Sequence, residues 1–367
     1  MPIIKLIIAG LLALGQILSP VGAWITNFGE AAFFTDWSAE DEFTSEAYIE
    51  LEKKAGEDFV ILNLADVQLD DDELYDTLGE ESMALVAKLI EDKEPDLITL
   101  SGDNAWGTMT YLALIELVDS YGIPWAAVMG NHDGQGCISE FWAAYHLAEA
   151  ENSLFEFGPK DMGYGNYVIN ITENGKIIHS VYMMDTHNNR DYEINGETVN
   201  GYDHIWDNQM DWYKWCVEGT NAIAGKTVES TVIMHIPVYE YFDAWYAVSS
   251  DVDDANGYLG TIDPEYADIA TGRRGEYGGH PPVNNGFFAL CKELGSTKNM
   301  LVGHDHDNDY SILYEGIRLT YAVKTGAGCY YTEDMMGGTT LAIDSDGVCS
   351  VTQNYYALND GEWSQVK

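Results

Sequence analysis

Basic residues are scarce in this chain. Its 367 residues include 17 lysines and arginines against 61 aspartates and glutamates, which gives a formal net charge of −44 at pH 7. A surface this negative repels nucleic-acid backbones and anionic lipid headgroups at long range. DNA, RNA and anionic membranes are therefore excluded as partners held by surface electrostatics. Such a charge is typical of a highly soluble protein or of one adapted to a salty, cation-rich medium. The weaker interpretation is that acidic runs such as residues 70–73 bind extra cations.

Cysteines are few, and they form no metal-binding or redox motif. The five cysteines lack C-x-x-C spacing, which excludes a zinc ribbon and a dithiol redox site. Two interpretations are open: one disulfide in an oxidising compartment, with Cys329 and Cys349 as the first pair to test, or simple core residues. The sequence also lacks a fixed-period repeat, which excludes solenoids and propellers.

The apolar segment at the N-terminus is too short for a membrane span. After Lys5 it covers residues 6–15, about ten residues, whereas a spanning helix needs about twenty. Small residues precede Trp24, as they do at a signal-peptidase site. We therefore predict a signal peptide over residues 1–23, with retention as an N-terminal anchor as the alternative. This predicts a secreted or cell-envelope protein with no other stable membrane partner.

Three apolar runs of strand length occur in the first half, and each is followed directly by polar residues. They lie at residues 58–65, 96–100 and 124–129, with helical spacing between them at 80–92 and 110–120. Continuous apolar runs are typical of strands buried on both faces. The alternation predicts a parallel sheet whose carboxyl edge carries the polar residues.

The second half mixes hairpins, helices and further strands. An Asn-Gly turn between residues 166–171 and 176–184 predicts a β-hairpin, and alternation over residues 311–353 predicts antiparallel strands. Residues 249–282 lack a clear periodicity and are interpreted as a long functional loop. The other predicted elements are strands at 230–234 and 299–302 and helices at 45–54, 205–217 and 284–293.

Carboxylate, carboxamide and imidazole side chains follow the predicted strands. This set suits Mn, Fe, Zn or Mg, because these ions take hard oxygen ligands and imidazole. A carboxylate shared by two ions about 3.5–4 Å apart also suits in-line attack on phosphorus. The candidate ligands are Asp66, Asp103, Asn131, His235, His304 and His306.

The order of the motifs is more specific than any one of them. A single Gly-Asp or Gly-Asn-His turn also occurs by chance, since these residues are common in strand-to-helix turns. In combination, D-x-Q, GDN, GNHD, MHIP and GHDH resemble the calcineurin-like metallophosphoesterases, the superfamily that includes purple acid phosphatases. The resemblance covers residues 59–328 and is nearest to the group related to purple acid phosphatase 29.

The resemblance implies a fold and a cofactor. The fold would be a four-layer α/β (α+β) arrangement in which two mixed β-sheets pack as a sandwich flanked by helices. Asp103 would bridge two divalent or mixed-valence metal ions. The first ion would be bound by Asp66, Asp103 and His306. The second ion would be bound by Asp103, Asn131, His235 and His304.

His132 and Asp133 are the catalytic residues that the resemblance implies. His132 would stabilise the transition state or protonate the leaving oxygen, and Asp133 would orient His132. The candidate ligands reach from Asp66 to His306 and must meet at one site. This predicts a single large domain over residues 24–367.

Gln68 departs from the family pattern, which has a histidine ligand at this position. A glutamine offers a neutral amide oxygen, which binds most transition metals more weakly than imidazole does. Three outcomes are open. In the first, Gln68 coordinates a harder metal. In the second, Gln68 contacts the ligands instead of the metal, and the first ion is bound less tightly; in the third, the first site is lost. We expect retained binding with an altered metal preference, because the other ligand positions are filled.

Arg273 and Arg274 stand out in a chain so poor in basic residues. One interpretation is that the two guanidinium groups together bind the phosphate or the leaving group of a substrate. An equally weighted alternative is a surface ion pair with nearby acids. His187 follows a predicted strand, and we expect it to be a solvated loop residue.

These patterns predict an enzyme that hydrolyses small phosphate esters, monoesters or diesters, with a metal-bound hydroxide at a dinuclear site. A degenerate metal-binding or surface-interaction protein with a weakened first site is the alternative, and Gln68 supports it. The intact GNHD and GHDH motifs oppose that alternative. The net charge and the export segment disfavour a nuclease on the same fold. The substrate and the oligomeric state are left open, because specificity resides in loops.

Overall fold

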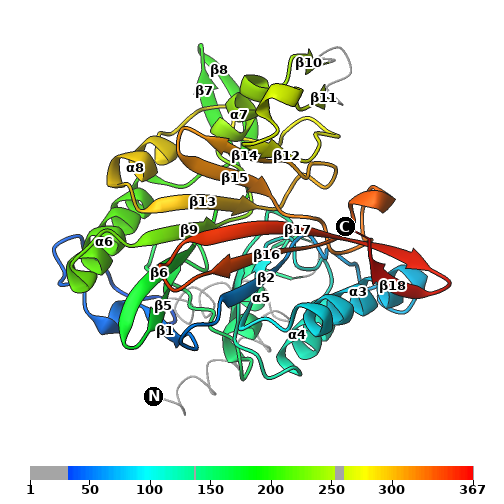
Figure 1. Cartoon of the computed structure of the whole chain (residues 1–367), viewed down its shortest axis with the longest axis horizontal. Coiled ribbons are helices and arrows are strands. Elements are labelled where there is room, and N and C mark those ends of the chain that lie inside the picture. Colours follow the sequence, from blue (N-terminus) through cyan, green and yellow to red (C-terminus); the bar gives the residue numbers. More distant parts are fainter. Residues whose placement is uncertain (1–31, 136–137, 253–259, 367) are drawn as a thin grey trace, which may run out of the picture.

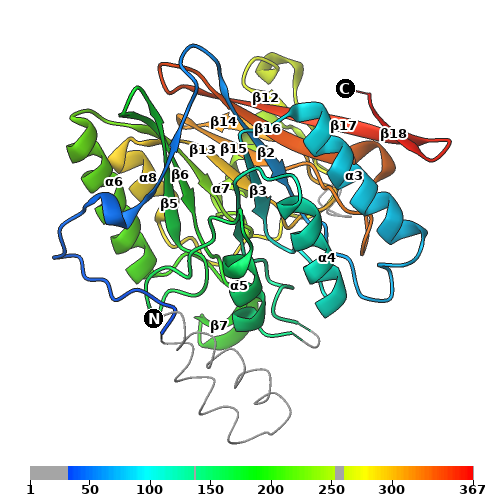
Figure 2. The same ribbon diagram turned by 90° about the horizontal axis from the view of Figure 1, so that it is seen from below.

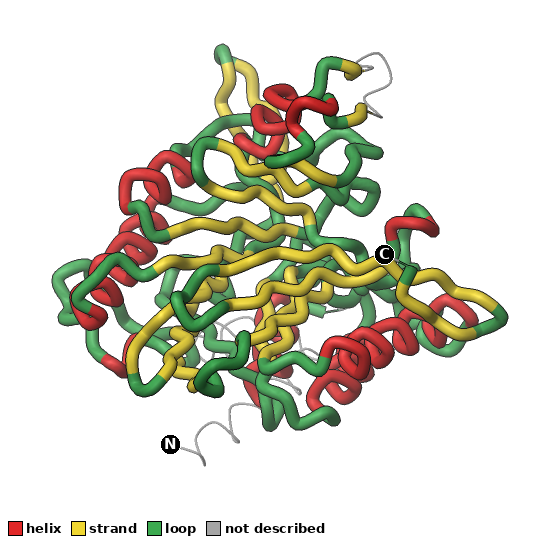
Figure 3. Tube along the Cα trace, in the orientation of Figure 1, coloured by secondary structure: helices red, strands yellow, loops and turns green. Residues whose placement is uncertain are grey.

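Two mixed β-sheets stack with helices on their outer faces in the computed structural model of this chain (Figures 1 and 2). The structure describes residues 32–135, 138–252 and 260–366, so the predicted signal peptide at residues 1–23 lies outside the described residues. Strands fill the centre of the molecule and helices lie around them (Figure 3). The layers confirm the predicted α/β sandwich.

The six-stranded sheet, in the order β18-β17-β16-β2-β3-β4, contains the three apolar runs of the first half as parallel strands. They are β2 (Phe59–Leu64), β3 (Leu97–Ser101) and β4 (Trp125–Val128). The antiparallel strands are β16 (Gly337–Ile343), β17 (Cys349–Asn359) and β18 (Glu362–Gln365). The helices on this side are α3 (Thr77–Lys93), α4 (Thr108–Asp119) and α5 (Glu140–Glu149).

The eight-stranded sheet has the order β1-β5-β6-β9-β13-β15-β14-β12, with a parallel run from β6 to β15. Its strands are β1 (Ile49–Glu52), β5 (Tyr167–Glu173), β6 (Lys176–Met183), β9 (Glu229–Ile233), β13 (Thr297–Val302), β15 (Ile317–Tyr321), β14 (Ser311–Tyr314) and β12 (Ala270–Thr271). The helices on this side are α6 (Asp207–Ala224), α7 (Glu240–Val248) and α8 (Phe287–Leu294). These elements confirm the predicted strands at 230–234 and 299–302 and the predicted helices at 205–217 and 284–293.

Side chains alternate along β6 between two buried clusters. Val181 and Met183 belong to the cluster between the sheets, and Tyr182 and Met184 belong to the cluster under the helices α6 to α8. Burying such a side chain fully contributes about 1.5–3 kcal/mol. Because both faces of the strand are covered, its position is fixed, and so are the loops at its end.

The predicted β-hairpin is confirmed as β5 and β6. Asn174 and Gly175 at its turn have φ values of 54° and 69°. Both residues adopt the left-handed conformation that a two-residue type I′ turn requires, and Asn-Gly is the pair that tolerates it best.

The prediction of a helix over residues 45–54 is wrong. This segment forms the short turn η1 (Ser45–Ala47) and then β1, which pairs in parallel with β5. Ile49 and Leu51 pack against the cluster between the sheets, while the residues that alternate with them face outwards. Pairing with the edge of β5 satisfies backbone groups, and this outweighs a short helical pattern.

The long unpatterned segment at residues 249–282 is only partly a loop. Its described residues include β12, which extends the eight-stranded sheet through β14. The other short elements of the chain are β7 (Asn189–Ile194), β8 (Glu197–Tyr202), β10 (Asp251–Val252), β11 (Gly260–Thr261), η2 (Pro264–Tyr266) and η3 (Glu333–Met335). Among the described residues, no helix has the length and apolar character needed to cross a membrane.

The disulfide between Cys329 and Cys349 is not formed, and both thiols are free. Cys349 pairs with Ile343, which lies opposite Phe59 at the start of β2. Cys329 follows Gly328, which packs against the backbone of Gln68 beyond the other end of β2. The two cysteines therefore lie at opposite ends of the strand.

Candidate metal centre

The ends of five parallel strands bring the predicted ligands together. Asp66 follows β2, Asp103 follows β3 and Asn131 follows β4, all in the six-stranded sheet. His235 follows β9, and His304 and His306 follow β13 in the eight-stranded sheet. All six side chains are buried. The centre therefore lies where the carboxyl edges of the two sheets meet, as the sequence predicts.

Two triads of possible metal ligands share Asp103. One triad is Asp103, His235 and His304, and the other is Asp66, Asp103 and His306; within each, the ligand atoms lie within 4.8 Å of one another. Nε2 of His235 lies 3.3 Å from Oδ2 of Asp103, and Nε2 of His306 lies 3.7 Å from Oδ1 of Asp66. This pattern of two sites with a common carboxylate suits a dinuclear centre.

Backbone groups hold each of the three histidines by one ring nitrogen. Nδ1 of His235 lies 2.9 Å from the carbonyl oxygen of Ser101, and Nδ1 of His306 lies 2.8 Å from that of Tyr330. The backbone of Gly279 hydrogen-bonds His304. When one nitrogen donates to a carbonyl, the other carries the lone pair that a metal needs. The histidines are thus oriented as metal ligands.

Asn131 and Gln68 add neutral oxygen donors, one to each triad. Oδ1 of Asn131 lies 3.0 Å from Nε2 of His235. Nε2 of Gln68 donates to Oδ2 of Asp103 at 3.0 Å, while Oε1 of Gln68 is buried with no hydrogen-bond partner among the described residues. A buried polar oxygen without a partner is costly unless something else binds it. The residues therefore fit a metal at the first position as well as at the second.

Close packing of the loops depends on glycine. A Cβ on Gly102 would lie 2.6 Å from Nδ1 of His235, and one on Gly303 would lie 2.5 Å from Oδ2 of Asp66. Several residues of the centre also adopt the left-handed conformation that non-glycine residues rarely take. Their φ values are 51° for Asp66, 47° for Gln68, 48° for Asp103 and 77° for His304.

The charges of the buried groups are strongly coupled. Burial opposes protonation of His235, but Asp103 outweighs it and raises the pKa of His235 to about 9. Burial likewise opposes ionisation of Asp103, but His235 outweighs it and lowers the pKa of Asp103. Burial and the neighbouring His235 lower the pKa of His304 to about 3. His304 is therefore ready to bind a metal, whereas a metal at His235 must displace a proton.

Lys324 is a buried cation beside the first triad, and no sequence motif marks it. Its side chain is 2% exposed, and Nζ donates to the backbone oxygen of Asp66 at 2.8 Å. Burial lowers the pKa of Lys324 to about 8, against the opposing effect of Asp66. Lys324 also contributes, after burial, to the lowered pKa of His306.

His132 lies at the edge of the centre, and Gln135 orients it. Nε2 of His132 lies 3.9 Å from Oδ2 of Asp103, and the side chain is 31% exposed, unlike the buried ligands. Nδ1 of His132 lies 2.8 Å from Oε1 of Gln135. The ring of Trp106 packs edge-on against the ring of His132. This leaves Nε2 directed at the shared carboxylate.

Asp133 does not orient His132 as expected. Its carboxylate accepts hydrogen bonds from the backbone N–H groups of Asn104, Ala105 and Gly130, at 2.8, 3.3 and 2.7 Å. It thereby ties the loop after β3 to the loop after β4. Burial, with Asp103 nearby, raises the pKa of Asp133 to about 7. Backbone amides compete for this side chain because it is fully enclosed by the two loops.

Arg273 and Arg274 have protein partners. Arg273 forms ion pairs with Asp334 and Asp309 at 2.9 and 3.6 Å. These contacts agree with the alternative interpretation, a surface ion pair with nearby acids. Arg274 is buried, and its Nε donates to the backbone oxygen of Glu276 at 3.1 Å. Their role in substrate binding stays a prediction.

His187 is not the solvated loop residue that the sequence suggested. Its ring stacks on that of Trp206 with centroids 3.7 Å apart, and Nε2 lies 2.8 Å from Oε1 of Gln209. Its Nδ1 lies 3.6 Å from Oδ2 of Asp185, which is buried. His187 is therefore a packed residue that supports Trp206.

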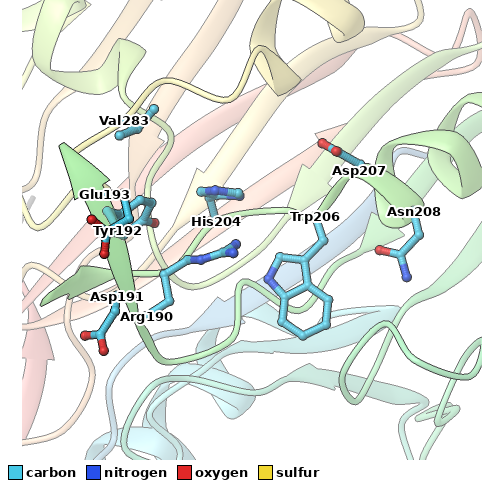
Figure 4. Close-up of a pocket in the computed structure, with 9 residues that line it drawn as sticks. All are labelled: Arg190, Asp191, Tyr192, Glu193, His204, Trp206, Asp207, Asn208 and Val283. Atoms are coloured by element: carbon cyan, nitrogen blue, oxygen red, sulfur yellow. The ribbon is translucent and has the colours of Figure 1, made fainter. Parts of the chain in front are cut away.

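A pocket of about 720 Å³ opens beside the β7–β8 ribbon (Figure 4). Tyr202, at the end of β8, packs its ring against His304 with centroids 4.3 Å apart, so the ribbon contacts the centre. Arg190 points its guanidinium between His204 and Trp206 in the pocket wall. Asp203 pairs with Arg190 at 3.2 Å and accepts from Nε1 of Trp206 at 2.9 Å, which orients both side chains.

The sequence matches the family described as Calcineurin-like phosphoesterase over residues 59–308. This span is more than half of the chain and includes all the predicted ligands. The chain therefore belongs to the calcineurin-like phosphoesterase family, and its buried aspartate and histidine triads are candidate metal sites of that family.

Relatives of known name are plant and yeast phosphatase-like proteins. The chain is 28% identical over 269 residues to "Probable inactive purple acid phosphatase 14" of Arabidopsis thaliana, covering 66% of this chain and 61% of that one. It is 26% identical to "Probable inactive purple acid phosphatase 29" of the same plant, covering 67% and 63%. It is also 26% identical to "Phosphatase DCR2" of Saccharomyces cerevisiae, covering 70% and 44%. The expected likeness to the purple acid phosphatase 29 group is confirmed, and the match spans less than two thirds of each of these relatives.

Solved structures with a similar fold include a dimetal phosphatase from Danio rerio, with a TM-score of 0.46 and 12% identity over 80% of this chain and 98% of that one. Another is the purple acid phosphatase PPD1 from yellow lupin, with a TM-score of 0.45 and 13% identity over 84% and 53%.

Proposed function

We propose that this chain is a metal-dependent phosphoesterase that hydrolyses small phosphate esters. The observation that carries the proposal is the pair of buried triads sharing Asp103, with His132 at their edge. A protein that needed metal for structure alone would not require a partly exposed histidine directed at the shared ligand. Family membership supports the same chemistry.

The ligand set supports two metal positions. The first would use Asp66, Asp103 and His306, with Gln68 as a neutral oxygen donor. The second would use Asp103, Asn131, His235 and His304. When bound, the ions would supply Lewis-acid chemistry that offsets charge on the phosphoryl oxygens and acidifies water.

His132 is proposed as the residue that acts on the leaving oxygen. Gln135 accepts from Nδ1 and leaves Nε2 on the side that faces the centre, where the imidazolium form of the ring would carry the proton to be donated. A general acid at this place would neutralise the leaving alkoxide as the bond to phosphorus breaks. Trp106 restricts the ring without taking a hydrogen bond from it.

The pocket beside the ribbon is the proposed place of the leaving group. The ribbon beside it contacts the centre through the ring of Tyr202 on that of His304, and Arg190 and the indole of Trp206 form part of the pocket wall. An oriented guanidinium binds oxygen anions well, and an indole face packs against flat or apolar groups. A small ester suits this pocket, whereas a nucleic-acid polymer is disfavoured by the net charge of −44.

A non-catalytic metal-binding protein is the second candidate function. Two of the plant relatives are named probable inactive phosphatases, and Gln68 replaces a ligand of the family pattern. The two candidates differ in turnover. Metal-loaded protein that hydrolyses neither a phosphomonoester nor a phosphodiester would favour the second, and loss of hydrolysis in His132→Ala with retained metal would favour the first.

We also propose that residues 1–23 direct export and that residues 24–367 form the single mature domain. The support is the order of charge, apolar run and small residues described above. Sequencing the N-terminus of protein recovered from outside the cell tests the proposal. A chain that begins at Trp24 agrees with it, and an intact Met1 contradicts cleavage.

A further inference from the structure

Lys324 is a positive charge fixed inside the candidate metal centre. It is buried, and the parallel bridges of Lys324 to Ala65 and to Met336 hold its backbone in place. Its Nζ donates to the backbone oxygen of Asp66 at 2.8 Å, which is its one side-chain hydrogen bond among the described residues. Asp66 belongs only to the first triad, so the ammonium lies on that side of the centre.

The two positions therefore differ in their surroundings. The first triad holds two carboxylates and one imidazole, and Lys324 offsets one of the two negative charges. Its fourth donor, Gln68, is neutral and already donates to Asp103. The second triad has the shared carboxylate of Asp103 and two imidazoles, with the amide oxygen of Asn131 beside them. Among the described residues, no lysine or arginine forms a hydrogen bond or an ion pair with these side chains.

We infer that Lys324 weakens the first metal position, so that the ion there binds in a separate, weak step. This inference rests on the proposed metal centre but not on catalysis. The physical reason is Coulomb repulsion, which is strong between like charges where water is excluded. The neutral donor Gln68 adds to the asymmetry, because it cannot compensate for the lysine.

A purely structural role for Lys324 is the competing explanation. The hydrogen bond to Asp66 could serve to hold the loop after β2, and its loss would then loosen both triads. Charge and structure make opposite predictions for the weak step. Removing a repelling charge tightens binding of the weak ion, whereas loosening the loop weakens binding of both ions.

The test is metal titration of the full mature chain after chelation, with Mn²⁺ and with Zn²⁺, by calorimetry and by metal analysis after dialysis. Wild-type protein should bind two ions in two resolved steps. Lys324→Met should tighten the weak step about tenfold or more while leaving the tight step within about threefold. Lys324→Arg, which keeps the charge, should retain two separated steps.

Lys53→Met is the matched control. Lys53 is also 2% exposed, but its Nζ pairs with Glu173 at 2.7 Å, and among the described residues no hydrogen bond or ion pair joins it to a candidate ligand. This variant should keep the wild-type titration. Thermal unfolding of both methionine variants shows whether either has lost its fold.

The outcomes separate the inference from the proposed function. An unchanged weak step in Lys324→Met, or weakening of both steps, overturns the inference. Wild-type protein that binds no metal overturns the inference together with the proposed function. Two-step binding that responds to Lys324→Met in a protein without phosphoesterase activity supports the inference and contradicts the proposed function alone.

Discussion

Gln68 donates a hydrogen bond from Nε2 to Oδ2 of Asp103 at 3.0 Å, and its Oε1 is left without a partner among the described residues. This relationship joins the residue that departs from the family pattern to the carboxylate that both triads share. It places a neutral oxygen where the pattern has an imidazole. The first position therefore has as many candidate donors as the second, but its amide oxygen from Gln68 is a weaker ligand than the imidazole of the family pattern.

Replacing Gln68 by histidine should strengthen the first metal position. Imidazole binds zinc and other late transition metals more strongly than an amide oxygen does, so the weaker ion should bind about tenfold or more tightly in Gln68→His. The preference should also move from Mg or Mn towards Zn. Metal titration of the two proteins measures this. Equal metal content and equal rates would exclude Gln68 as a ligand.

Asp103→Asn should disturb both metal positions at once. The carboxylate is the only group that belongs to both triads among the described residues. Loss of its charge should weaken binding of both ions and lower hydrolysis by a factor on the order of a hundred or more. Asp66→Asn is the matched comparison and should weaken one ion. If both variants lose the same single ion, Asp103 is not shared.

His132→Ala should slow turnover without removing metal. A general acid contributes about 10²–10⁴-fold in rate, and the side chain is outside both triads. Gln135→Ala should lower kcat by a smaller factor, because it leaves the ring in place but unoriented. Measuring kcat together with bound metal checks both variants. If kcat falls in proportion to the loss of bound metal in either variant, these residues act through the metal ligands.

Asp133→Ala should act mainly on stability. The substitution leaves the backbone N–H groups of Asn104, Ala105 and Gly130 without their acceptor inside the protein. Each buried unsatisfied donor costs about 1–3 kcal/mol, so the free energy of unfolding should fall by about 3 kcal/mol or more. Urea unfolding of metal-free protein measures this. A normal unfolding free energy combined with lost turnover would restore the catalytic role that the sequence suggested.

The metal-free protein should lose stability between pH 7 and pH 9. The pKa of His235 is about 9 in the folded protein, above the ordinary value of 6.5. A raised pKa means that the protonated form favours folding, so this contribution is complete below pH 6.5 and is lost as the pH rises through 9. The raised pKa of Asp133, about 7 against an ordinary 3.8, also lowers stability as the pH rises, but between about pH 4 and pH 7 and so below this window.

Metal should remove the dependence of stability on His235, because an ion there replaces the proton. Thermal unfolding of chelated and of Mn-loaded protein at pH 7 and pH 9 checks the prediction. Chelated protein should melt at a lower temperature at pH 9, and the gap between the two forms should widen. If the melting temperatures of the two forms change equally between pH 7 and pH 9, the assignment of His235 as a ligand is contradicted.

The sequence predicts this fold, and the gathering of the candidate ligands at one place, because their signals are local. Apolar runs mark the buried strands, and a polar motif follows each one directly, so the meeting point of the strands follows from the parallel sheet. Lys324, in contrast, lies in an ordinary segment with no motif, and its place beside Asp66 arises from an isolated bridge to Ala65, which is far from it in the sequence. The roles of Asp133 and Gln135 could not be predicted either, because their hydrogen-bond partners depend on how the neighbouring loops pack.

The most direct test is hydrolysis of para-nitrophenyl phosphate and of its diester by chelated protein as Mn²⁺ or Zn²⁺ is added back. If the two buried triads form a working centre, hydrolysis appears with the weaker of two bound ions, and Asp103→Asn lowers it by a factor on the order of a hundred or more. A chain that binds two ions and hydrolyses neither ester, or an activity that is unchanged in Asp103→Asn, would contradict the central claim.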